Sequence, residues 1–206
     1  MIAVIDYGGG NLGSLLAALR RRGAPFTIVD DAWQLEAADA AVLPGDGAFG
    51  VTMLALRERE LDRAISTHIA RGKPFLGICV GMQVLFEESE EFGNSAGFGV
   101  FRGRVARFSH AAPRVPHIGW NQLDICGAHP FVGNLEARPF AYFMHSYRAG
   151  VGPDTLAACT HGERFSAVVA RGNVMGTQFH PEKSQDTGAK LLDNFLALTK
   201  EFPLCS

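Results

Sequence analysis

The 206-residue sequence has few cysteines, no long apolar run and almost no excess of charge of either sign. Its four cysteines, at positions 79, 126, 159 and 205, form no C-x-x-C pair, so they fit neither a zinc cage nor a disulfide framework and indicate a reducing compartment. The first apolar stretch ends at Asp6, too early for a signal peptide, and no run of about eighteen apolar residues follows. We therefore expect a cytoplasmic protein with no membrane association.

The charges are scattered: 19 basic and 21 acidic residues give a formal charge of −2, and only Arg20–Arg22 form a basic run. This distribution argues against a nucleic-acid partner or a membrane surface. A chain of this length buries roughly 70% of its unfolded surface, and 47% of its residues are apolar, so it needs no metal or disulfide to form a core. The prediction is one domain spanning residues 1–206, with no metal and no cofactor.

The first third of the chain alternates short apolar runs with helical patterns. Four runs are expected to be strands: Ile2–Ile5, Phe26–Val29, Ala40–Leu43 and Phe75–Ile78. Leucines at helical spacing from Leu12 to Leu19 follow Asn11, a candidate N-cap, and the longest helical pattern runs from Phe49 to Arg71. This alternation predicts an α/β fold, a three-layer, mostly parallel sheet flanked by helices.

The middle of the chain differs, because residues 100–166 are rich in glycine, proline, histidine and aromatic residues. Short alternating runs such as Ala141–Tyr147 predict antiparallel or mixed strands that pack onto the same sheet. From Ser184 onward, leucine and phenylalanine on a charged background predict a closing helix.

One glycine-rich loop supports an alternative function. Gly8, Gly10 and Gly13 fit G-x-G-x-x-G after a strand, and Asp30 follows Gly10 by twenty residues, as in dinucleotide-binding proteins. Against this, Asp6 would put a carboxylate where a pyrophosphate needs positive potential. A nucleotide-binding oxidoreductase remains an alternative, and an ordinary tight turn is the simpler interpretation.

The strongest nucleophile candidate is Cys79, which follows an apolar strand within Gly77-Ile78-Cys79-Val80-Gly81. Two glycines around a nucleophile at a strand-to-helix junction are typical of a nucleophile elbow. The start of the following helix should favour the thiolate. The alternatives are a small buried cysteine, and a redox or chaperone-like protein that uses the same cysteine elbow.

A base for this nucleophile is found in His180-Pro181-Glu182. Pro181 should turn the chain away from its strand, so that Glu182 can orient one imidazole nitrogen while the other faces the thiol. A surface turn is the alternative. His-x-Glu also occurs in zinc deaminases, but those need a downstream P-C-x-x-C that this sequence lacks.

A loop after another strand, Pro44-Gly45-Asp46-Gly47, can present backbone N–H groups without side-chain obstruction. An oxyanion hole requires such donors, although the same residues also form ordinary turns.

Taken together, G-I-C-V-G-M-Q at 77–83 and Q-F-H-P-E-K-S at 178–184 resemble the class I (triad) glutamine amidotransferases. Within that family, three segments resemble the glutaminase subunits of imidazole glycerol phosphate synthases, which serve histidine biosynthesis: P-G-D-G-A-F at 44–49, P-H-I-G-W-N at 116–121 and F-M-H-S-Y at 143–147.

The matching segments run from Asp6 to about Leu192. Two residues depart from the family pattern, since Asp46 stands where a hydrophobic residue is frequent and Met144 where valine is usual.

The resemblance implies a catalytic triad of Cys79, His180 and Glu182. It also implies that glutamine is hydrolysed through a Cys79 thioester and that the ammonia passes to a separate β/α-barrel cyclase subunit in a heterodimer. The implied oxyanion and substrate-binding residues are Asp46, Gly47, Val80, Gln83 and Ser146.

The resemblance further implies that the cyclase contacts Asn11, Trp120, Tyr142 and Lys183. A buried core tryptophan is the alternative for Trp120. His117 and His145 are expected to order loops by hydrogen bonding, because the triad already has its base.

Overall fold

The four apolar runs expected to be strands are strands. In the computed structural model, which describes residues 1–10 and 12–201, they are β1 (Ile2–Ile5), β2 (Phe26–Val29), β3 (Ala40–Leu43) and β4 (Phe75–Ile78). Every residue of β1, β3 and β4 is buried, whereas β2 lies at the edge and is partly exposed. Strands covered on both faces are continuously apolar, which explains why β1, β3 and β4 were predictable.

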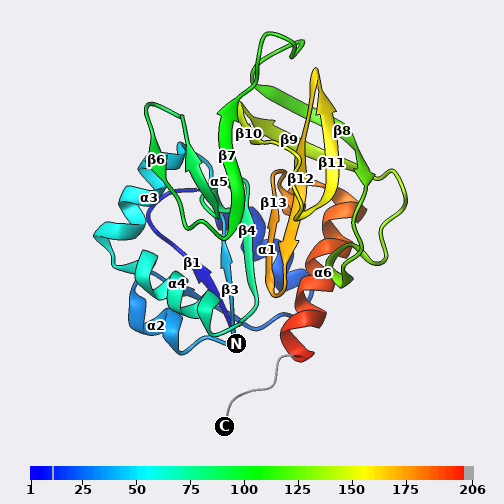
Figure 1. The fold of residues 1–206 in the computed structure, drawn as a ribbon. Helices are drawn as coiled ribbons and strands as arrows, with labels where there is room; N and C mark the ends of the chain where they lie inside the picture. Colours follow the sequence, from blue (N-terminus) through cyan, green and yellow to red (C-terminus); the bar gives the residue numbers. More distant parts are fainter. Residues whose placement is uncertain (11, 202–206) are drawn as a thin grey trace.

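The described residues form a main sheet of nine strands in the order β2-β1-β3-β4-β13-β12-β11-β8-β9 (Figure 1). Its other members are β8 (His117–Ile125), β9 (Phe140–His145), β11 (Thr155–His161), β12 (Glu163–Arg171) and β13 (Val174–Thr177). The five strands from β2 to β13 pair in parallel, and the pairs from β13 to β9 are antiparallel. The predicted mostly parallel sheet is therefore a mixed sheet.

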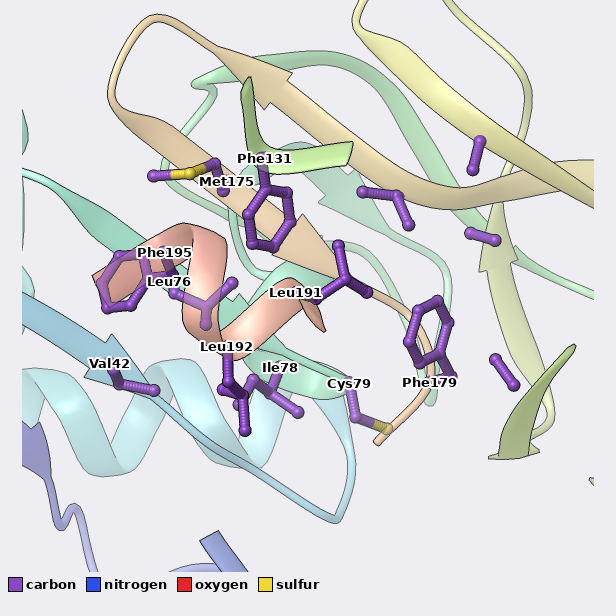
Figure 2. Close-up of a cluster of buried hydrophobic side chains, with 14 of the residues drawn as sticks. Val42, Leu76, Ile78, Cys79, Phe131, Met175, Phe179, Leu191, Leu192 and Phe195 are labelled. Atoms are coloured by element: carbon purple, nitrogen blue, oxygen red, sulfur yellow. The ribbon is translucent and has the colours of Figure 1, made fainter. Parts of the chain in front are cut away.

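Helices cover both faces of the parallel half, which confirms the three-layer α/β fold. On one face lie α1 (Leu12–Arg21) and α6 (Gln185–Glu201), and on the other α2 (Ala32–Glu36), α3 (Phe49–Glu58) and α4 (Leu61–Ala70). Successive strand residues alternate between the two cores: Val4 packs in the α1/α6 cluster and Ile5 in the α2–α4 cluster. Cys79 lies at the end of the first cluster, beside Phe179 (Figure 2).

The prediction of one long helix from Phe49 to Arg71 is wrong, because α3 and α4 are separate helices. The chain turns at Glu60, whose φ of 57° is left-handed. Leu56 before the turn and Leu61 after it are both buried in the same core cluster. The apolar pattern therefore continues across the break, and the sequence alone does not reveal the turn.

The prediction that the whole middle of the chain packs onto one sheet is also wrong in part. A second sheet, with the order β10-β7-β5-β6, is formed by β5 (Phe86–Ser89), β6 (Ser95–Ala96), β7 (Phe101–Arg107) and β10 (Tyr147–Ala149). The expected strand Ala141–Tyr147 is divided at Ser146, because β9 stays in the main sheet and β10 enters the second one. This division places Ser146 between the two sheets.

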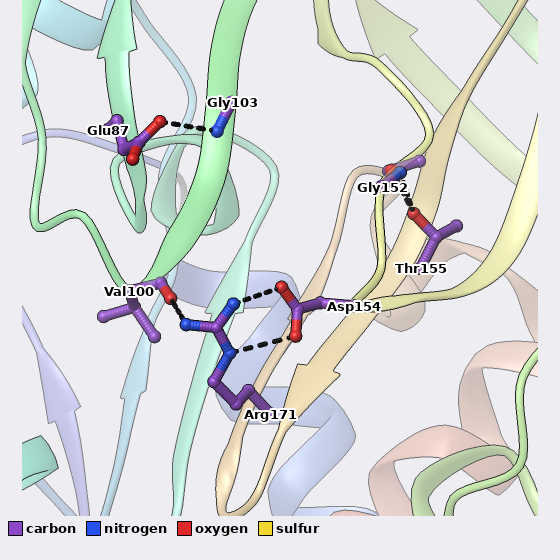
Figure 3. A network of polar contacts seen from close by, with 8 residues as sticks. Glu87, Val100, Gly103, Gly152, Asp154, Thr155 and Arg171 are labelled. Atoms are coloured by element: carbon purple, nitrogen blue, oxygen red, sulfur yellow. Dashed lines mark hydrogen bonds and ion pairs between the residues drawn. The ribbon is translucent and has the colours of Figure 1, made fainter.

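Arg171 of β12 ties the two sheets together (Figure 3). Its Nε donates to Oδ1 of Asp154 at 3.0 Å and its Nη2 to Oδ2 at 2.6 Å, while Nη1 donates to the carbonyl of Val100 at 2.5 Å. Val100 directly precedes β7, so one planar guanidinium holds the start of the second sheet against the first.

His68 of α4 makes stability depend on pH. Its Nε2 donates to the carbonyl of Pro74 at 3.2 Å, and the side chain is buried. Burial, which disfavours the cation more than the Pro74 hydrogen bond favours it, lowers its pKa to about 4. The unfolded chain, with a histidine pKa of about 6.5, binds more protons between these values, so acidification destabilises the fold.

His68→Gln keeps a hydrogen-bond donor for Pro74 but removes the titrating group. Wild type should therefore lose about 2 kcal/mol more unfolding free energy than this variant between about pH 7 and pH 5. Urea denaturation at both pH values measures this loss. The matched control is His110→Gln in an exposed loop. An equal acid sensitivity of wild type and His68→Gln would contradict the assignment.

Candidate active site

Cys79 lies between β4 and α5 (Val80–Gln83) with φ 56° and ψ −113°, a conformation that few non-glycine residues adopt. The predicted sharp turn is confirmed. A Cβ on Gly77 would lie 2.3 Å from the carbonyl oxygen of Gly81, and one on Gly81 would lie 2.0 Å from that of Leu43. Both glycines are therefore required for the turn that presents the cysteine.

His180 and Glu182 come together beside this cysteine. Pro181 starts the one-turn helix η2 (Pro181–Lys183), which directs Glu182 back so that its Oε1 lies 2.9 Å from Nδ1 of His180. The two side chains are only 7% and 5% exposed, so the surface-turn alternative is wrong. Nε2 of His180 is buried and has no hydrogen-bond partner among the described residues. It is therefore available to a reacting group.

The protonated form of His180 is favoured. Burial alone would lower its pKa, but contact with Cys79 and hydrogen bonding to Glu182 together outweigh burial and raise the pKa to about 10. A buried imidazolium between a carboxylate and a sulfur is suited to pair with a thiolate and to give up a proton.

The loop after β3 lies against the start of α5. A Cβ on Gly45 would lie 2.3 Å from Cγ1 of Val80 and 2.5 Å from the hydroxyl of Tyr7, so the contact requires glycine. Gly47 has φ 145°, in the range that favours glycine, and the space around its Cα is open. Asp46 and Gly47 are thus held next to the elbow by a close backbone approach at Gly45.

A cavity of about 260 Å³ opens over the cysteine. It is lined by Asp46, Gly47, Cys79, Gln83, Glu91, Pro116, Met144, His145, Ser146 and Tyr147. Five of the predicted site residues are in this set. A larger cavity of about 340 Å³, lined by residues such as Met1, Asp39 and Lys200, has no cysteine or histidine in its wall, so we place the chemistry in the smaller one.

Glu91 is a cavity residue that the sequence did not single out. Its Oε2 accepts a hydrogen bond from the backbone N–H of Phe49 at 2.8 Å, and burial, offset in part by that bond, raises its pKa. In the sequence it ends the acidic stretch 87–91, which is typical of a solvated surface. The fold places Glu91 in the same cavity wall as Cys79, which the sequence does not reveal.

His117 and His145 form a buried pair, as expected of loop-ordering residues. Nδ1 of His117 lies 3.0 Å from Nε2 of His145, and Nδ1 of His145 donates to the carbonyl of Tyr147 at 2.8 Å. Burial lowers the pKa of His117 to about 4 and that of His145 to about 3. Both rings are neutral near pH 7, and His145 forms part of the cavity wall.

In the glycine-rich loop that suggested dinucleotide binding, a backbone N–H group is already hydrogen-bonded within the protein. Oδ1 of Asp6 accepts the N–H of Gly8 at 2.9 Å, a donor that a phosphate would need. A Cβ on Gly10 would lie 3.2 Å from Cα of Gly45, so this glycine permits packing against the loop after β3. The local geometry disfavours a nucleotide site.

Two of the predicted interface residues, exposed Trp120 and half-buried Tyr142, form an aromatic pair. Trp120 of β8 is opposite Tyr142 of β9, and their rings make a T-shaped contact with centroids 5.9 Å apart. Trp120 is 47% exposed, so the buried-core alternative is wrong. Lys183 is half-buried in η2, and Asn11 lies outside the described residues.

Within residues 1–10 and 12–201, no group of three or more histidine, cysteine, aspartate or glutamate side chains is placed to hold a metal ion. The helices of this part of the chain are all too short or too polar to cross a membrane.

Comparison with protein families gives a match to glutamine amidotransferase class-I over residues 3–198. The chain is 48% identical to the imidazole glycerol phosphate synthase subunit HisH of Thermosynechococcus vestitus, covering 97% of this chain and 98% of that protein. It is 45% identical to the subunit of the same name from Salinibacter ruber, covering 96% and 94%.

Solved structures agree on the fold. A glutamine amidotransferase superposes with a TM-score of 0.75 at 21% identity, covering 97% of this chain and all of that one. A chain of PurLQS from Thermotoga maritima gives a TM-score of 0.73 at 22% identity, covering 96% and 97%.

Proposed function

Because the chain belongs to the class I glutamine amidotransferase family, we propose that it is the glutaminase subunit of an imidazole glycerol phosphate synthase in histidine biosynthesis. It hydrolyses glutamine and supplies the ammonia to a cyclase subunit that makes imidazole glycerol phosphate and AICAR. The observation that carries the proposal is the strained Cys79 turn beside the buried His180–Glu182 pair, at the floor of a cavity.

Hydrolysis proceeds in two steps. The Cys79 thiolate attacks the side-chain amide carbon of glutamine and forms a C–S bond, and His180 gives a proton to the departing nitrogen, which leaves as ammonia. Water, deprotonated by His180, then attacks the thioester, releasing glutamate and regenerating the thiol. Glu182 holds Nδ1 of His180, so that Nε2 faces the reaction.

The oxyanion of each tetrahedral intermediate requires N–H donors next to the sulfur. The backbone N–H of Val80 is one, because Val80 directly follows the nucleophile at the start of α5. The second comes from the backbone near Asp46 or Gly47, in the loop that packs against Val80 through Gly45.

Different residues of the cavity bind different groups of glutamine. Ser146 and Gln83 line the cavity and supply polar contacts, and the Glu91 carboxylate supplies negative charge for the substrate's ammonium group. Glu91 and Asp46 both place a carboxylate on this wall, and a carboxylate that binds the ammonium group selects an amino acid over a simple amide.

The partner is a β/α-barrel cyclase in a heterodimer, and it docks on the face of β8 and β9 around Trp120 and Tyr142. Ile118, Phe140 and Met144 on the same two strands are also exposed, and alternate register places them on the same face. The described cysteines are free, which supports the cytoplasm as the compartment.

Within the triad, His180→Ala should lower the kcat of glutamine hydrolysis in the cyclase complex by about 10²- to 10⁴-fold, because the base transfers the protons itself. Glu182→Gln should lower it by a smaller factor, since an orienting residue acts through position and tautomer.

Glutamate release at saturating glutamine tests both variants. Glu58→Gln on an exposed part of α3 is the matched control for the loss of one carboxylate, and it should keep wild-type turnover. Equal losses in the two triad variants, or a larger loss for Glu182→Gln, would refute the assigned roles.

A further inference from the structure

A buried side-chain amide contacts the catalytic sulfur. Nε2 of Gln178 lies 3.9 Å from Sγ of Cys79, within hydrogen-bond distance for sulfur. The contact follows from the sheet: β13 pairs in parallel with β4, with Thr177 opposite Ile78, so the next residues on the two strands emerge side by side. Gln178 is fully buried, yet the triad mechanism gives it no role.

The orientation of this amide is determined by its neighbours. Nε2 of Gln83 lies 2.9 Å from the carbonyl of Tyr147, which only accepts, so this atom is the NH₂ group of Gln83. The same NH₂ group lies 3.0 Å from the other end of the Gln178 amide, which must therefore be the oxygen. The NH₂ group of Gln178 is thus the end that faces the sulfur.

The Tyr147 carbonyl, which accepts the hydrogen bond from Gln83, also accepts one from His145. Nδ1 of His145 is protonated because it donates to this carbonyl, so Nε2 of His145 accepts from Nδ1–H of His117. Nε2 of His117 in turn accepts from the amide of Asn121 at 3.2 Å. The lowered pKa values of both histidines agree with these neutral tautomers.

We propose that Gln178 is a further catalytic residue, which donates an amide N–H to Cys79 Sγ and favours the thiolate, with Gln83 and the Tyr147 carbonyl holding that donor in place. The inference deepens the proposed glutaminase function. A hydrogen bond to the charged form of an acid favours that form. A neutral amide does so without adding a second cation beside the His180 imidazolium.

The test measures the thiolate directly, through the pH dependence of alkylation by iodoacetamide, located by mass spectrometry in the full chain. Gln178→Met keeps most of the side-chain shape and removes the donor. We expect the pKa of Cys79 alkylation to rise by about one unit and the rate at neutral pH to fall several-fold. Gln122→Met on β8, whose amide donates to the carbonyl of Arg138, is the matched control and should leave both unchanged.

Two other cysteines are internal references. Exposed Cys126 should react equally in all variants, and buried Cys159 should stay unmodified wherever the chain is folded. If Cys159 becomes reactive in Gln178→Met, Gln178→Leu replaces it in the same measurement. The other titratable groups near Cys79 are unchanged in every variant: Tyr7, Asp46, Glu91, His145, Tyr147, His180 and Glu182.

The role of Gln178 would be overturned if a folded variant that lacks its amide donor showed the same pH dependence of Cys79 alkylation as wild type. That outcome is separate from the proposed function, which is assayed as glutamate release by the wild-type chain with its cyclase. A shifted thiol pKa together with no glutaminase activity in wild type would overturn the function and keep the hydrogen bond.

Discussion

Cys79→Ala is expected to abolish glutamine-dependent synthesis by the complex with the cyclase and to leave ammonia-dependent synthesis intact. Removal of the nucleophile leaves no thioester route, and the loss in kcat should be at least about 10⁴-fold. We expect the cyclase to accept ammonia whatever its source, because the acceptor should be bound by the partner. Three other cavities in the described part of the chain, of about 340, 150 and 220 Å³, have no cysteine or histidine in their walls.

Product formation with glutamine, and separately with an ammonium salt at high pH, measures the two activities of one preparation. Cys126→Ala is the matched control, since this cysteine is exposed and away from the cavity, and it should keep both activities. Co-elution of the variant with the cyclase shows that the complex is assembled. Loss of both activities in an assembled complex would contradict the division of labour.

Three strands of the parallel half, β1, β3 and β4, were predictable from sequence because they are buried on both faces. The second sheet was not, since its strands are only partly buried and show no regular alternation: in β5, Phe86 and Ser89 are buried while Glu87 and Glu88 are exposed. Whether such a strand joins one sheet or another depends on contacts distant in sequence. β5 pairs with β7, and β7 with β10, about sixty residues beyond β5.

The candidate site residues also differ in how readily the sequence reveals them. Cys79 and the His180–Glu182 pair lie in short local motifs whose glycines and proline dictate the backbone, so residue types at close spacing were enough to identify them. Glu91 ends an acidic stretch that is typical of a solvated surface, and Gln178, although it begins Q-F-H-P-E-K-S, has no spacing that would pair it with Cys79. Their positions at the cavity and the sulfur result from how α3 and β13 pack.

The second large effect expected is activation by the partner. A glutaminase that ran freely would waste glutamine and release ammonia into water, where it is protonated. We expect the chain alone to be poorly active and the complex with cyclase and its ligand to be about 10²- to 10³-fold faster, the usual effect of one oxyanion donor. The gate should be the loop with Gly45, Asp46 and Gly47, where a glycine on each side lets a peptide unit rotate.

The packing around this loop limits the rotation to one end. Gly45 is confined by Tyr7 and Val80, whereas the space around the Cα of Gly47 is open. We therefore expect the rotation at the peptide between Asp46 and Gly47, while Gly45 keeps the loop against the elbow.

The proposed docking face on β8 and β9 is linked by hydrogen bonds to the segment that carries His180. The N–H of Tyr142 donates to Oγ of Ser184 at 3.0 Å, and this hydroxyl donates to the carbonyl of His180 at 2.7 Å. A partner that docks on Tyr142 thus acts on the segment that carries the base.

Steady-state glutamate release should therefore be measured for the chain alone, with the cyclase, and with the cyclase plus its ligand. Ammonia-dependent synthesis in the last sample verifies that the cyclase is loaded and active. Because a rotated peptide changes stabilisation of the oxyanion more than binding of glutamine, the increase should be in kcat with a smaller change in KM. A lone chain as fast as the loaded complex would show that the oxyanion donors are already in place, and the loop would then be no gate.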